Sequence, residues 1–568
     1  MLHAVVMGDI GWPHLYHVGD EAMTEAALHE LRSRGVEKIT LVAADPETAT
    51  SLHAVPAVPR FHFKLRWPRK WHDSHLKKVL APLEGYERGT SPATTVFDAV
   101  HDADFVVIAG GGNLTSGYIH QMYERLALLR VSQHFGRPVF VSGQTLDSNY
   151  EEGDVRVISE LLEGAEIFGL RERTSLNVAR RLLPMDGRLR AVGDDGLLTR
   201  RSDPPKAVTQ HLPERYIVAS FERPTWLAEG LVEKYYEVVA NALDEVAEQL
   251  DSAVLLIPHA GSFELDHPKD DIVSHSAIAK LSARVQDLPL MRASEVLGVM
   301  AHALCTVSTR YHPLVFGAQI GIPMIGLAHT AYTWHRMRGA AHQFGAANHI
   351  LPIAVLKEPS AFAELVRDMV STGHLVRSVT NSAARRRAHQ ERWWDEIVGR
   401  AGFLVTAQAD AQEPPRNHDL EDPAQVTLPA AALHFSYLIA DESMSRAEAE
   451  MRADRLESSL LLMTGRWESA DQSRQDEAAR ATRVEAERDA AVRESRALEV
   501  SLESSRSQQA ALLLRLSDIE EQVNRTTEER DKWRNAARSF RSEVQRYRSR
   551  RTTRLVDAVD RILLRHLR

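Results

Sequence analysis

The sequence predicts an α/β protein with two Rossmann-like, doubly wound domains that face a cleft, followed by a long α-helical tail that forms a coiled coil. Up to about residue 405, short apolar runs alternate with amphipathic stretches, which is typical of strands and helices in alternation. A second series of such runs starts after Pro204-Pro205. From Ala430 onward the chain has no proline and a single glycine, Gly465, which favours continuous helix.

The composition excludes several classes of protein. The 568 residues are 44% hydrophobic and 26% charged, as in ordinary soluble domains. The 69 basic and 78 acidic residues give a net charge of −9, so we expect no nucleic acid as a partner. The single cysteine, Cys305, leaves no intrachain disulfide and no cysteine-rich metal site. Since no apolar run approaches the ~20 residues of a membrane-spanning helix, we expect a cytoplasmic protein.

Two stretches predict the α/β domains, residues 1–203 and residues 204–405. Their apolar runs are nearly continuous, which indicates strands of parallel sheets that helices cover on both faces. The first domain has runs at 3–7, 38–43, 104–109, 138–142 and 166–170, with helical patterns at 20–34 and 119–135. The second has runs at 215–220, 253–258, 303–308 and 323–328. Domains of this kind usually bind ligand at the carboxyl ends of their strands.

The rest of the chain divides into three predicted segments. Residues 406–430 carry four prolines among polar residues and predict a linker. In residues 431–551, a heptad register around Val484 places apolar residues at eight of twelve core positions, which favours a coiled coil and a homo-oligomer. A solvated single helix is the alternative. Residues 552–568 predict a basic amphipathic helix that either lies on an anionic membrane at the inner face or packs on another copy of the chain.

Candidate site residues follow the predicted strands of the first domain. Asp20 and Glu21, in Gly19-Asp20-Glu21-Ala22, begin the helix after the first strand. They either complement the helix dipole or face the cleft, where they accept hydrogen bonds from ligand hydroxyls or act as a base.

The run at 104–109 leads into Gly110, Gly111, Gly112 and Asn113. Three glycines let a backbone approach a ligand closely, and their amides, with the N-terminus of the following helix, suit an anionic or polyhydroxyl group. A turn with left-handed backbone angles is the alternative. The spacing is not that of a dinucleotide site. Gln144 offers an amide side chain after the next strand in the same way.

Arg171 follows the run at 166–170 and precedes a helix. It either holds a phosphate or carboxylate with two hydrogen bonds or pairs with Glu172 on the surface. Asp194 ends a further strand-like run and is either a helix cap or a ligand contact.

The second domain carries the most specific pattern, from Ser308 to Pro313. Arg310 and His312 stand two residues apart at the end of a strand, so we expect them to point the same way. One supplies a fixed positive charge and the other titrates near neutral pH. A structural arginine beside a satisfied histidine is the alternative.

In this order, the residues resemble the polysaccharide pyruvyl transferase family over residues 1–340. The match ends with Gly321-Ile322-Pro323. The resemblance implies a GT-B-like architecture and a transfer of the enolpyruvyl carbons of phosphoenolpyruvate onto two hydroxyls of a sugar. The acceptor is then a saccharide of a cell-envelope polysaccharide or exopolysaccharide. Phosphoenolpyruvate is the donor substrate, and no further cofactor is implied.

This chemistry assigns a role to each candidate residue. His312 is the expected acid, and Arg310 and Arg171 hold the donor's phosphate and carboxylate. Asp20 or Glu21 accepts from the sugar hydroxyls. The remaining substrate contacts are expected from Gly110, Gly111, Gly112, Asn113, Gln144, Asp194, Ser308 and His329.

The chain departs from the family pattern in two places. The family's asparagine before Gly-Asp is His17 here, within the aromatic stretch 12–17. The family's Tyr-x-x-Lys after the proline is replaced by His329 and Tyr332, with cations later, at Arg336 and Arg338.

Two other functions stay open at this point. The first is a glycosyltransferase that uses a nucleotide-sugar, with Glu264, Asp266 or Asp270 binding the ribose. The second is a non-catalytic sugar-binding scaffold. The scattered histidines form no metal motif, so we expect no metal.

Overall fold

The computed structural model describes residues 2–406, except 90–94, 148–149, 185–186, 228, 265–268 and 372. The coiled-coil and amphipathic-helix predictions lie outside the described residues, as does the linker beyond its first residue. No helix in the described part of the chain is long and apolar enough to cross a membrane.

The first sheet has eight strands in the order β4-β3-β1-β5-β7-β8-β9, with β6 paired to β7. All its pairings are parallel. The strands are β1 (Leu2–Met7), β3 (Val36–Ala43), β4 (Ala57–Pro59), β5 (Phe105–Ile108), β6 (Gly111–Leu114), β7 (Val139–Leu146), β8 (Ile167–Leu170) and β9 (Leu189–Ala191). The five predicted runs of the first domain correspond to β1, β3, β5, β7 and β8.

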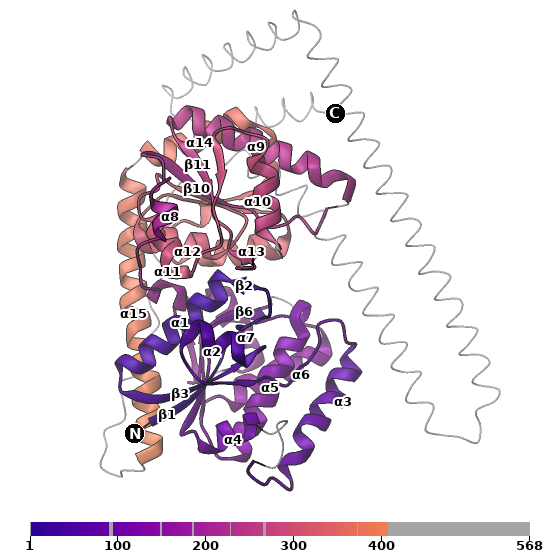
Figure 1. Cartoon of the computed structure of the whole chain (residues 1–568). Coiled ribbons are helices and arrows are strands. Elements are labelled where there is room, and N and C mark those ends of the chain that lie inside the picture. The colour runs from indigo at the N-terminus through magenta and orange to yellow at the C-terminus, as the bar shows by residue number, and fades with distance from the viewer. Residues whose placement is uncertain are drawn as a thin grey trace, which may run out of the picture. The chain divides into compact units, whose positions relative to one another are not determined.

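Helices cover both faces of this sheet (Figure 1). Along β1, Val5 packs into one core cluster and Ala4 and Val6 into the other, because successive side chains of a strand point to opposite faces. The helices are α1 (Val18–Ser33), α2 (Pro46–His53), α3 (Arg69–Leu80), α4 (Thr95–Asp102), α5 (Ile119–His134), α6 (Glu152–Gly164) and α7 (Arg173–Leu182). Short 3-10 turns are η1 (Ala81–Leu83), η3 (Ser116–Tyr118) and η4 (Asp195–Leu198).

The second sheet has six strands, all parallel, in the order β13-β11-β10-β14-β15-β16. They are β10 (Tyr216–Ser220), β11 (Ala253–Leu256), β13 (Val285–Asp287), β14 (Thr306–Ser308), β15 (Met324–Ala328) and β16 (Ile350–Pro352). The helices are α8 (Lys206–Thr209), α9 (Val232–Leu250), α10 (Asp271–Ala279), α11 (Ala293–Met300), α12 (His312–Ile320), α13 (Ala331–His342), α14 (Pro359–Ser371) and α15 (Gly373–Thr406), with 3-10 turns η5 (Glu229–Leu231), η6 (Ala347–His349) and η7 (Ile353–Lys357). The four predicted runs of the second domain correspond to β10, β11, β14 and β15, so the predicted α/β class is confirmed.

Two elements join the sheets. A short antiparallel pair links β2 (Tyr16–His17) to β12 (Ala260–Gly261). The long helix α15 runs past both sheets (Figure 1), and its Trp393 and Trp394 are fully buried in a core cluster of the first sheet. The segment expected to close the second domain therefore returns its end to the first sheet, because two large indoles find an apolar face there.

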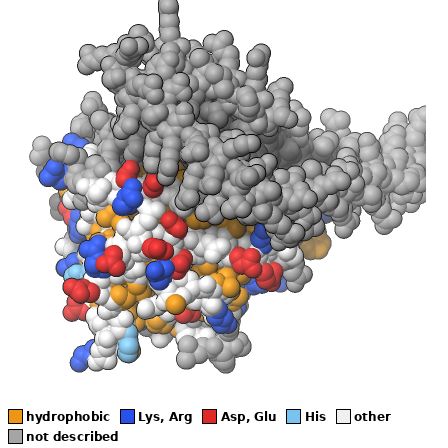
Figure 2. Space-filling view, turned by 90° about the horizontal axis from the view of Figure 1, so that it is seen from above, with side chains coloured by type: hydrophobic (Ala, Val, Ile, Leu, Met, Phe, Trp, Pro, Cys, Tyr) orange, Lys and Arg blue, Asp and Glu red, His pale blue; other side chains and the backbone are white. Residues whose placement is uncertain are grey.

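The described surface carries both signs of charge. On the face seen in Figure 2, lysine and arginine side chains lie beside aspartate and glutamate side chains. This mixture agrees with the nearly balanced composition.

Candidate active site

Residues that follow strands of both sheets meet in one region, which we call the junction. Its members are Gly19, Gly112, Arg171, Asp194, Tyr311, His312 and Arg336. Contacts join the sheets here: the Arg171 guanidinium lies 4.3 Å above the Tyr311 ring, and the Tyr332 hydroxyl donates to the carbonyl of Gly112 at 3.3 Å. The carboxyl ends of the two sheets therefore contribute side chains to a single place.

Arg171 is buried at the junction with one nitrogen left over. Its Nε donates to Thr145 at 2.6 Å and to Glu172 at 2.9 Å, and its Nη1 donates to Asp194 at 2.8 Å. Burial lowers the pKa of the guanidinium, but Tyr311 and the two carboxylates raise it, and the net shift is upward. The expected ion pair with Glu172 is therefore present, but it is buried and does not lie on the surface. Nη2 has no hydrogen-bond partner among the described residues.

Gly112 brings a second arginine close to that free nitrogen. A Cβ placed on Gly112 would lie 2.9 Å from Nη2 of Arg171 and 3.4 Å from Cζ of Arg336. Both guanidinium groups therefore pack against this glycine, which has no side chain to keep them away. Arg336 also lies 4.9 Å above the Tyr311 ring, and its Nε lacks a hydrogen-bond partner within the described chain.

His312 is the first residue of α12 and lies beside the start of α1. A Cβ on Gly19 would lie 1.8 Å from Nδ1 of His312, so the imidazole occupies the space that a side chain would need. The Nε2 atom lies 3.8 Å from Oδ1 of Asp194 and has no hydrogen-bond partner among the residues described. Burial lowers the pKa of His312 to about 3, against the opposing effect of Asp194. The imidazole is neutral at pH 7.

Asp194 is the cap that its position allowed, and it also pairs with Arg171. Its Oδ1 accepts from the amide of Gly196 at 2.7 Å and caps η4, while Oδ2 accepts from Arg171. Burial raises the pKa of Asp194, but Arg171 and His312 lower it by a larger amount, so the net shift is downward. Asp194 is therefore the fixed anion between the arginine and the histidine.

Helix α15 holds the turn that carries Asp194. The neighbouring Asp195 accepts hydrogen bonds from Gln390 at 2.6 Å and from Trp394 at 3.0 Å. Gln390 also accepts from the amide of Gly193 at 2.6 Å. Packing of α15 against this turn therefore holds Asp194 in place at the junction.

Asp20 faces a second polar group built around Asp9. Asp9 accepts from Asn113 at 2.6 Å, from Gln121 at 2.7 Å and from Trp12 at 2.8 Å. Burial and the charge of Asp9 raise the pKa of Asp20 to about 6. Asp20 keeps 21% of its side chain exposed, so it is a titratable carboxyl within reach of solvent.

Glu21, predicted to act together with Asp20, points elsewhere. Its side chain is 1% exposed and accepts from the amide of Gly11 at 3.2 Å and pairs with His53 at 2.7 Å. On a helix, consecutive residues point about 100° apart, so only one of the two acids can face the junction. Glu21 instead anchors the loop after β1.

The three glycines have a different role from the one expected. Among the described residues with positive φ, none is Gly110, Gly111 or Gly112. Gly111 and Gly112 are the first two residues of strand β6, and α5 begins only at Ile119, so no α-helix N-terminus follows the glycines directly. Each lacks room for a side chain: a Cβ would lie 2.7 Å from Asp195 at Gly110 and 3.2 Å from Gln144 at Gly111. Close approach of polar side chains explains all three.

Gln144 is buried behind these glycines. Its Nε2 donates to the carbonyl of Ala109 at 2.6 Å, and its Oε1 has no partner in the part of the chain that the structure describes. It therefore supports the glycine segment from behind.

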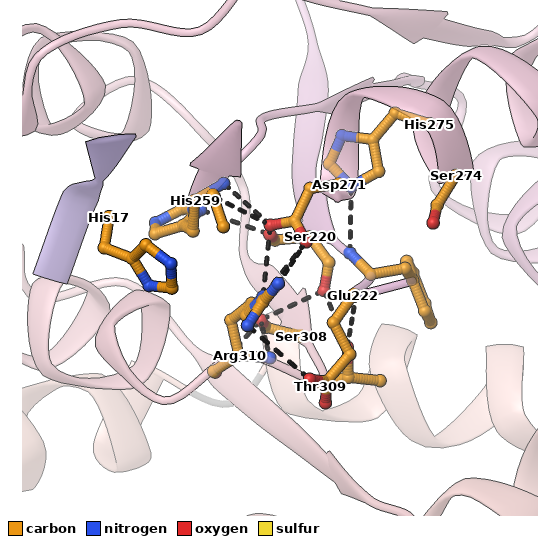
Figure 3. A network of polar contacts seen from close by, with 12 residues as sticks. His17, Ser220, Glu222, His259, Asp271, Ser274, His275, Ser308, Thr309 and Arg310 are labelled. Atoms are coloured by element: carbon orange, nitrogen blue, oxygen red, sulfur yellow. Dashed lines mark hydrogen bonds and ion pairs between the residues drawn. The ribbon is translucent and has the colours of Figure 1, made fainter. Parts of the chain in front are cut away.

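Arg310 lies in a separate network (Figure 3). Its Nε lies 3.1 Å from both carboxylate oxygens of Asp271, and its Nη1 lies 3.5 Å from Glu222. Burial raises the pKa of Glu222, but Arg310 and His329 lower it, and the net shift is downward. Two ionised carboxylates therefore face this one guanidinium.

Ser308 and His329 belong to the Arg310 network as well. The Ser308 hydroxyl donates to the carbonyl of Ser220 at 3.1 Å and accepts from the amide of Arg310 at 2.8 Å. His329 lies 2.6 Å from Glu222, and its ring stacks on Trp226 with centroids 3.6 Å apart. Both side chains have protein partners that hold them in place.

Arg310 and His312 do not point the same way, contrary to the expectation. The strand β14 ends at Ser308, and Tyr311 already has helical backbone angles of φ −71° and ψ −50°. The alternation of an extended strand therefore no longer applies between the two residues.

The aromatic stretch 12–17 connects the two sheets. The Trp12 ring lies 3.9 Å from the Arg60 guanidinium, Tyr16 accepts from the amide of Ala293 at 3.3 Å, and His14 pairs with Glu264 at 2.6 Å. Glu264, one of the acids expected for a nucleotide-sugar site, is thus an ion-pair partner. Asp270 is the N-cap residue before α10 and has a positive φ of 48°, and Asp266 lies outside the described residues.

Sequence reasoning missed several members of the site. Asp9 follows β1 and could have been found by the strand-end rule that identified Asp20. Asp271 and Glu222 reach Arg310 only through the fold. Among the described residues, no cluster of histidine, cysteine and acids fits a metal ion.

Several solved structures share this arrangement of elements. The Staphylococcus aureus protein MnaA with UDP aligns at 9% identity over 74% of this chain and all of its own, with a TM-score of 0.49. The UDP-GlcNAc 2-epimerase from Methanocaldococcus jannaschii aligns at 13% identity over 66% and 93% of the chains, with a TM-score of 0.44. The glycotransferase of kitacinnamycin aligns at 15% identity over 70% and 98%, with a TM-score of 0.46. At these values the likenesses say nothing about the ligand of this chain.

No curated protein matches the sequence. The family model for polysaccharide pyruvyl transferase, in contrast, matches residues 17–330, which is more than half of the chain. The matched stretch contains members of the junction from both sheets: Gly19, Gly112, Arg171, Asp194, Tyr311 and His312. The chain therefore belongs to the polysaccharide pyruvyl transferase family.

Proposed function

We propose that the junction transfers the enolpyruvyl carbons of phosphoenolpyruvate onto two hydroxyls of a sugar in a cell-envelope polysaccharide or exopolysaccharide. The products are a cyclic pyruvate ketal and inorganic phosphate. The observation that carries this proposal is the pair of guanidinium groups, Arg171 and Arg336, that pack against Gly112 with nitrogens left unpaired within the described chain. Family membership supports the reaction class.

The donor carries a phosphate and a carboxylate, which need positively charged partners. Nη2 of Arg171 and Nε of Arg336 offer donors on adjacent guanidinium groups, a geometry suited to oxyanions. Arg336 thus takes the place of the lysine that the family carries nearby. Because two carboxylates already neutralise Arg310, its contacts favour a role in positioning the second sheet.

His312 supplies the proton chemistry in this proposal. Its neutral imidazole accepts the proton of the first sugar hydroxyl at Nε2 and delivers it to the methylene carbon of the donor. The C2 atom then bonds to the sugar oxygen. Cleavage of the C2–O bond releases phosphate, the second sugar oxygen closes the ring, and its proton leaves with phosphate.

Two neighbouring carboxylates assist His312. Asp194, 3.8 Å away, stabilises the imidazolium that forms between the two transfers. Asp20, whose pKa is about 6, accepts a hydrogen bond from the sugar. Asn113 orients the neighbouring Asp9.

The test is binding and turnover by the full chain. Phosphoenolpyruvate and a panel of nucleotide-sugars are compared by calorimetry, and saccharide acceptors are then screened for release of phosphate and for the ketal methyl signal in proton NMR. Binding of phosphoenolpyruvate with ketal formation supports the proposal. Binding of a nucleotide-sugar alone makes the chain a glycosyltransferase and contradicts it.

A further inference from the structure

The segment from residue 60 to residue 80 is strongly basic in a chain that is acidic overall. It contains Arg60, Lys64, Arg66, Arg69, Lys70, Lys77 and Lys78 against a single acid, Asp73. Two of the cations are held by the protein: Arg69 pairs with Asp154 and Glu151, and Arg60 lies 3.7 Å from Glu124. Lys64, Arg66, Lys77 and Lys78 are exposed.

Helix α3 gathers its exposed cations on one face. At about 100° per residue, positions 70, 71, 74, 77 and 78 fall within an arc of about 120°. This arc carries Lys70, Lys77, Lys78 and Trp71, all exposed, whereas His72 and Leu76 on the opposite side are buried. Nearby acids lie off the arc or are paired: Asp73 pairs with Arg156 at 2.8 Å, and Glu84 follows the helix beyond η1.

Large apolar side chains stand among these cations. Trp71 is 54% exposed and Leu65, in the loop before the helix, is 50% exposed. The Trp67 ring meets Trp71 at 6.4 Å between centroids, and Nζ of Lys64 lies 5.8 Å from the Trp67 ring. A tryptophan with its ring in solvent loses apolar burial unless another surface covers it.

The occupant of this face must match both features at once. Exposed lysines attract an anionic surface, and a tryptophan and a leucine among them favour the boundary between headgroups and acyl chains. Helix α3 lies at the outside of the first sheet, where it packs on α5 (Figure 1).

We propose that α3 and the loop before it, residues 64–78, bind the surface of an anionic lipid bilayer. Trp71 and Leu65 enter the boundary of the headgroups, and Lys64, Arg66, Lys77 and Lys78 pair with lipid phosphates. The inference concerns a face outside the junction and does not depend on which donor the junction binds.

The test measures flotation of the full chain with phosphatidylcholine vesicles, with and without phosphatidylglycerol. Wild-type protein is expected to float only with the anionic vesicles, and less at high salt. The variant Lys64→Glu, Lys77→Glu, Lys78→Glu is expected to bind at least about 100-fold more weakly, because each lysine lost near the surface weakens binding roughly fivefold. Replacing Trp71 and Leu65 with alanine is expected to weaken binding as well.

Matched controls separate this face from general charge and from general surface apolarity. The variant Lys206→Glu, Lys234→Glu, Lys280→Glu changes the net charge equally at exposed positions elsewhere and should float like wild type. Leu281→Ala, at a residue 50% exposed, controls for Leu65. Thermal unfolding verifies that each variant is folded. A wild type that does not float, a charge-reversed α3 variant that floats equally well, or binding to an acidic oligonucleotide but not to vesicles would overturn the proposal.

Discussion

Arg171 and Arg310 occupy similar places in the sequence, each shortly after a buried strand, yet their surroundings differ. Arg171 forms ion pairs with Glu172 and Asp194. Its Nη2 atom has no hydrogen-bond partner within the described chain and lies next to Arg336 and Gly112. Arg310 faces Asp271 and Glu222 with no second guanidinium in contact among the described residues. We therefore propose the anion site at Arg171, where the fold adds a second cation, and not at Arg310.

The largest expected effect concerns the proton-carrying group at the first of these two places. His312→Ala should lower kcat about 10²- to 10⁴-fold, because no other imidazole of the described chain meets Asp194 at the junction. The rate of phosphate release from phosphoenolpyruvate and an acceptor measures it. His302→Ala, at an exposed residue, is the control. Full activity in the His312 variant would remove the residue from the mechanism.

The second prediction concerns the stability role of Arg310. Arg310→Gln leaves the buried Asp271 carboxylate without its cation and should lower the free energy of unfolding by ~3 kcal/mol. Denaturant unfolding measures this difference. Adding Asp271→Asn should recover part of the loss, since the unpaired charge is then absent. An unchanged stability in Arg310→Gln would make this network no different from an exposed ion pair.

The third prediction tests the close contact between the sheets. Gly19→Ala places a methyl group where the His312 ring lies, and should cost about 1–3 kcal/mol of stability and lower kcat. Gly85→Ala, where a Cβ meets nothing within 4 Å, is the matched control. Equal melting temperatures for the two variants would show that the sheets separate easily at this point.

The fourth prediction distinguishes the two places by pH. Burial lowers the pKa of His259 and His275, near Arg310, to about 4, so the unfolded chain binds more protons than the native one between pH 6.5 and 4. The folded state of that region is most stable above pH 6.5. Its stability decreases as the pH is lowered, by about 1.4 kcal/mol per pH unit for each histidine.

At the junction the signs oppose each other. The lowered pKa of His312 also makes the folded state less stable as the pH falls. Asp20 and Asp195 have the opposite effect, because their pKa values are raised to about 6 and they bind protons more readily in the native state. Hydrogen exchange from pH 7 to pH 5 should therefore show the second sheet losing protection first. Equal loss in both sheets would contradict this difference.

The sequence predicted the long buried strands, since nine apolar runs match nine strands. It missed β4, β13 and β16, which are three-residue strands at the edges of their sheets, and β6, which starts within the glycines. Asp20, Arg171 and His312 were found because each follows a predicted strand, and the end of a strand can be located from the sequence alone. The carboxylates that neutralise Arg310 were not, because Asp271 lies 39 residues from its partner and only the fold brings them together.

We propose that Arg171 and Arg336, and not Arg310, hold the anionic donor. The most direct measurement is the calorimetric affinity of the full chain for phosphoenolpyruvate in wild type, Arg336→Gln and Arg338→Gln, the last a nearby arginine that lies against Trp334. Loss of one charged hydrogen-bond donor should weaken binding about 10- to 100-fold in Arg336→Gln and leave Arg338→Gln unchanged. Wild-type affinity in Arg336→Gln would contradict the claim.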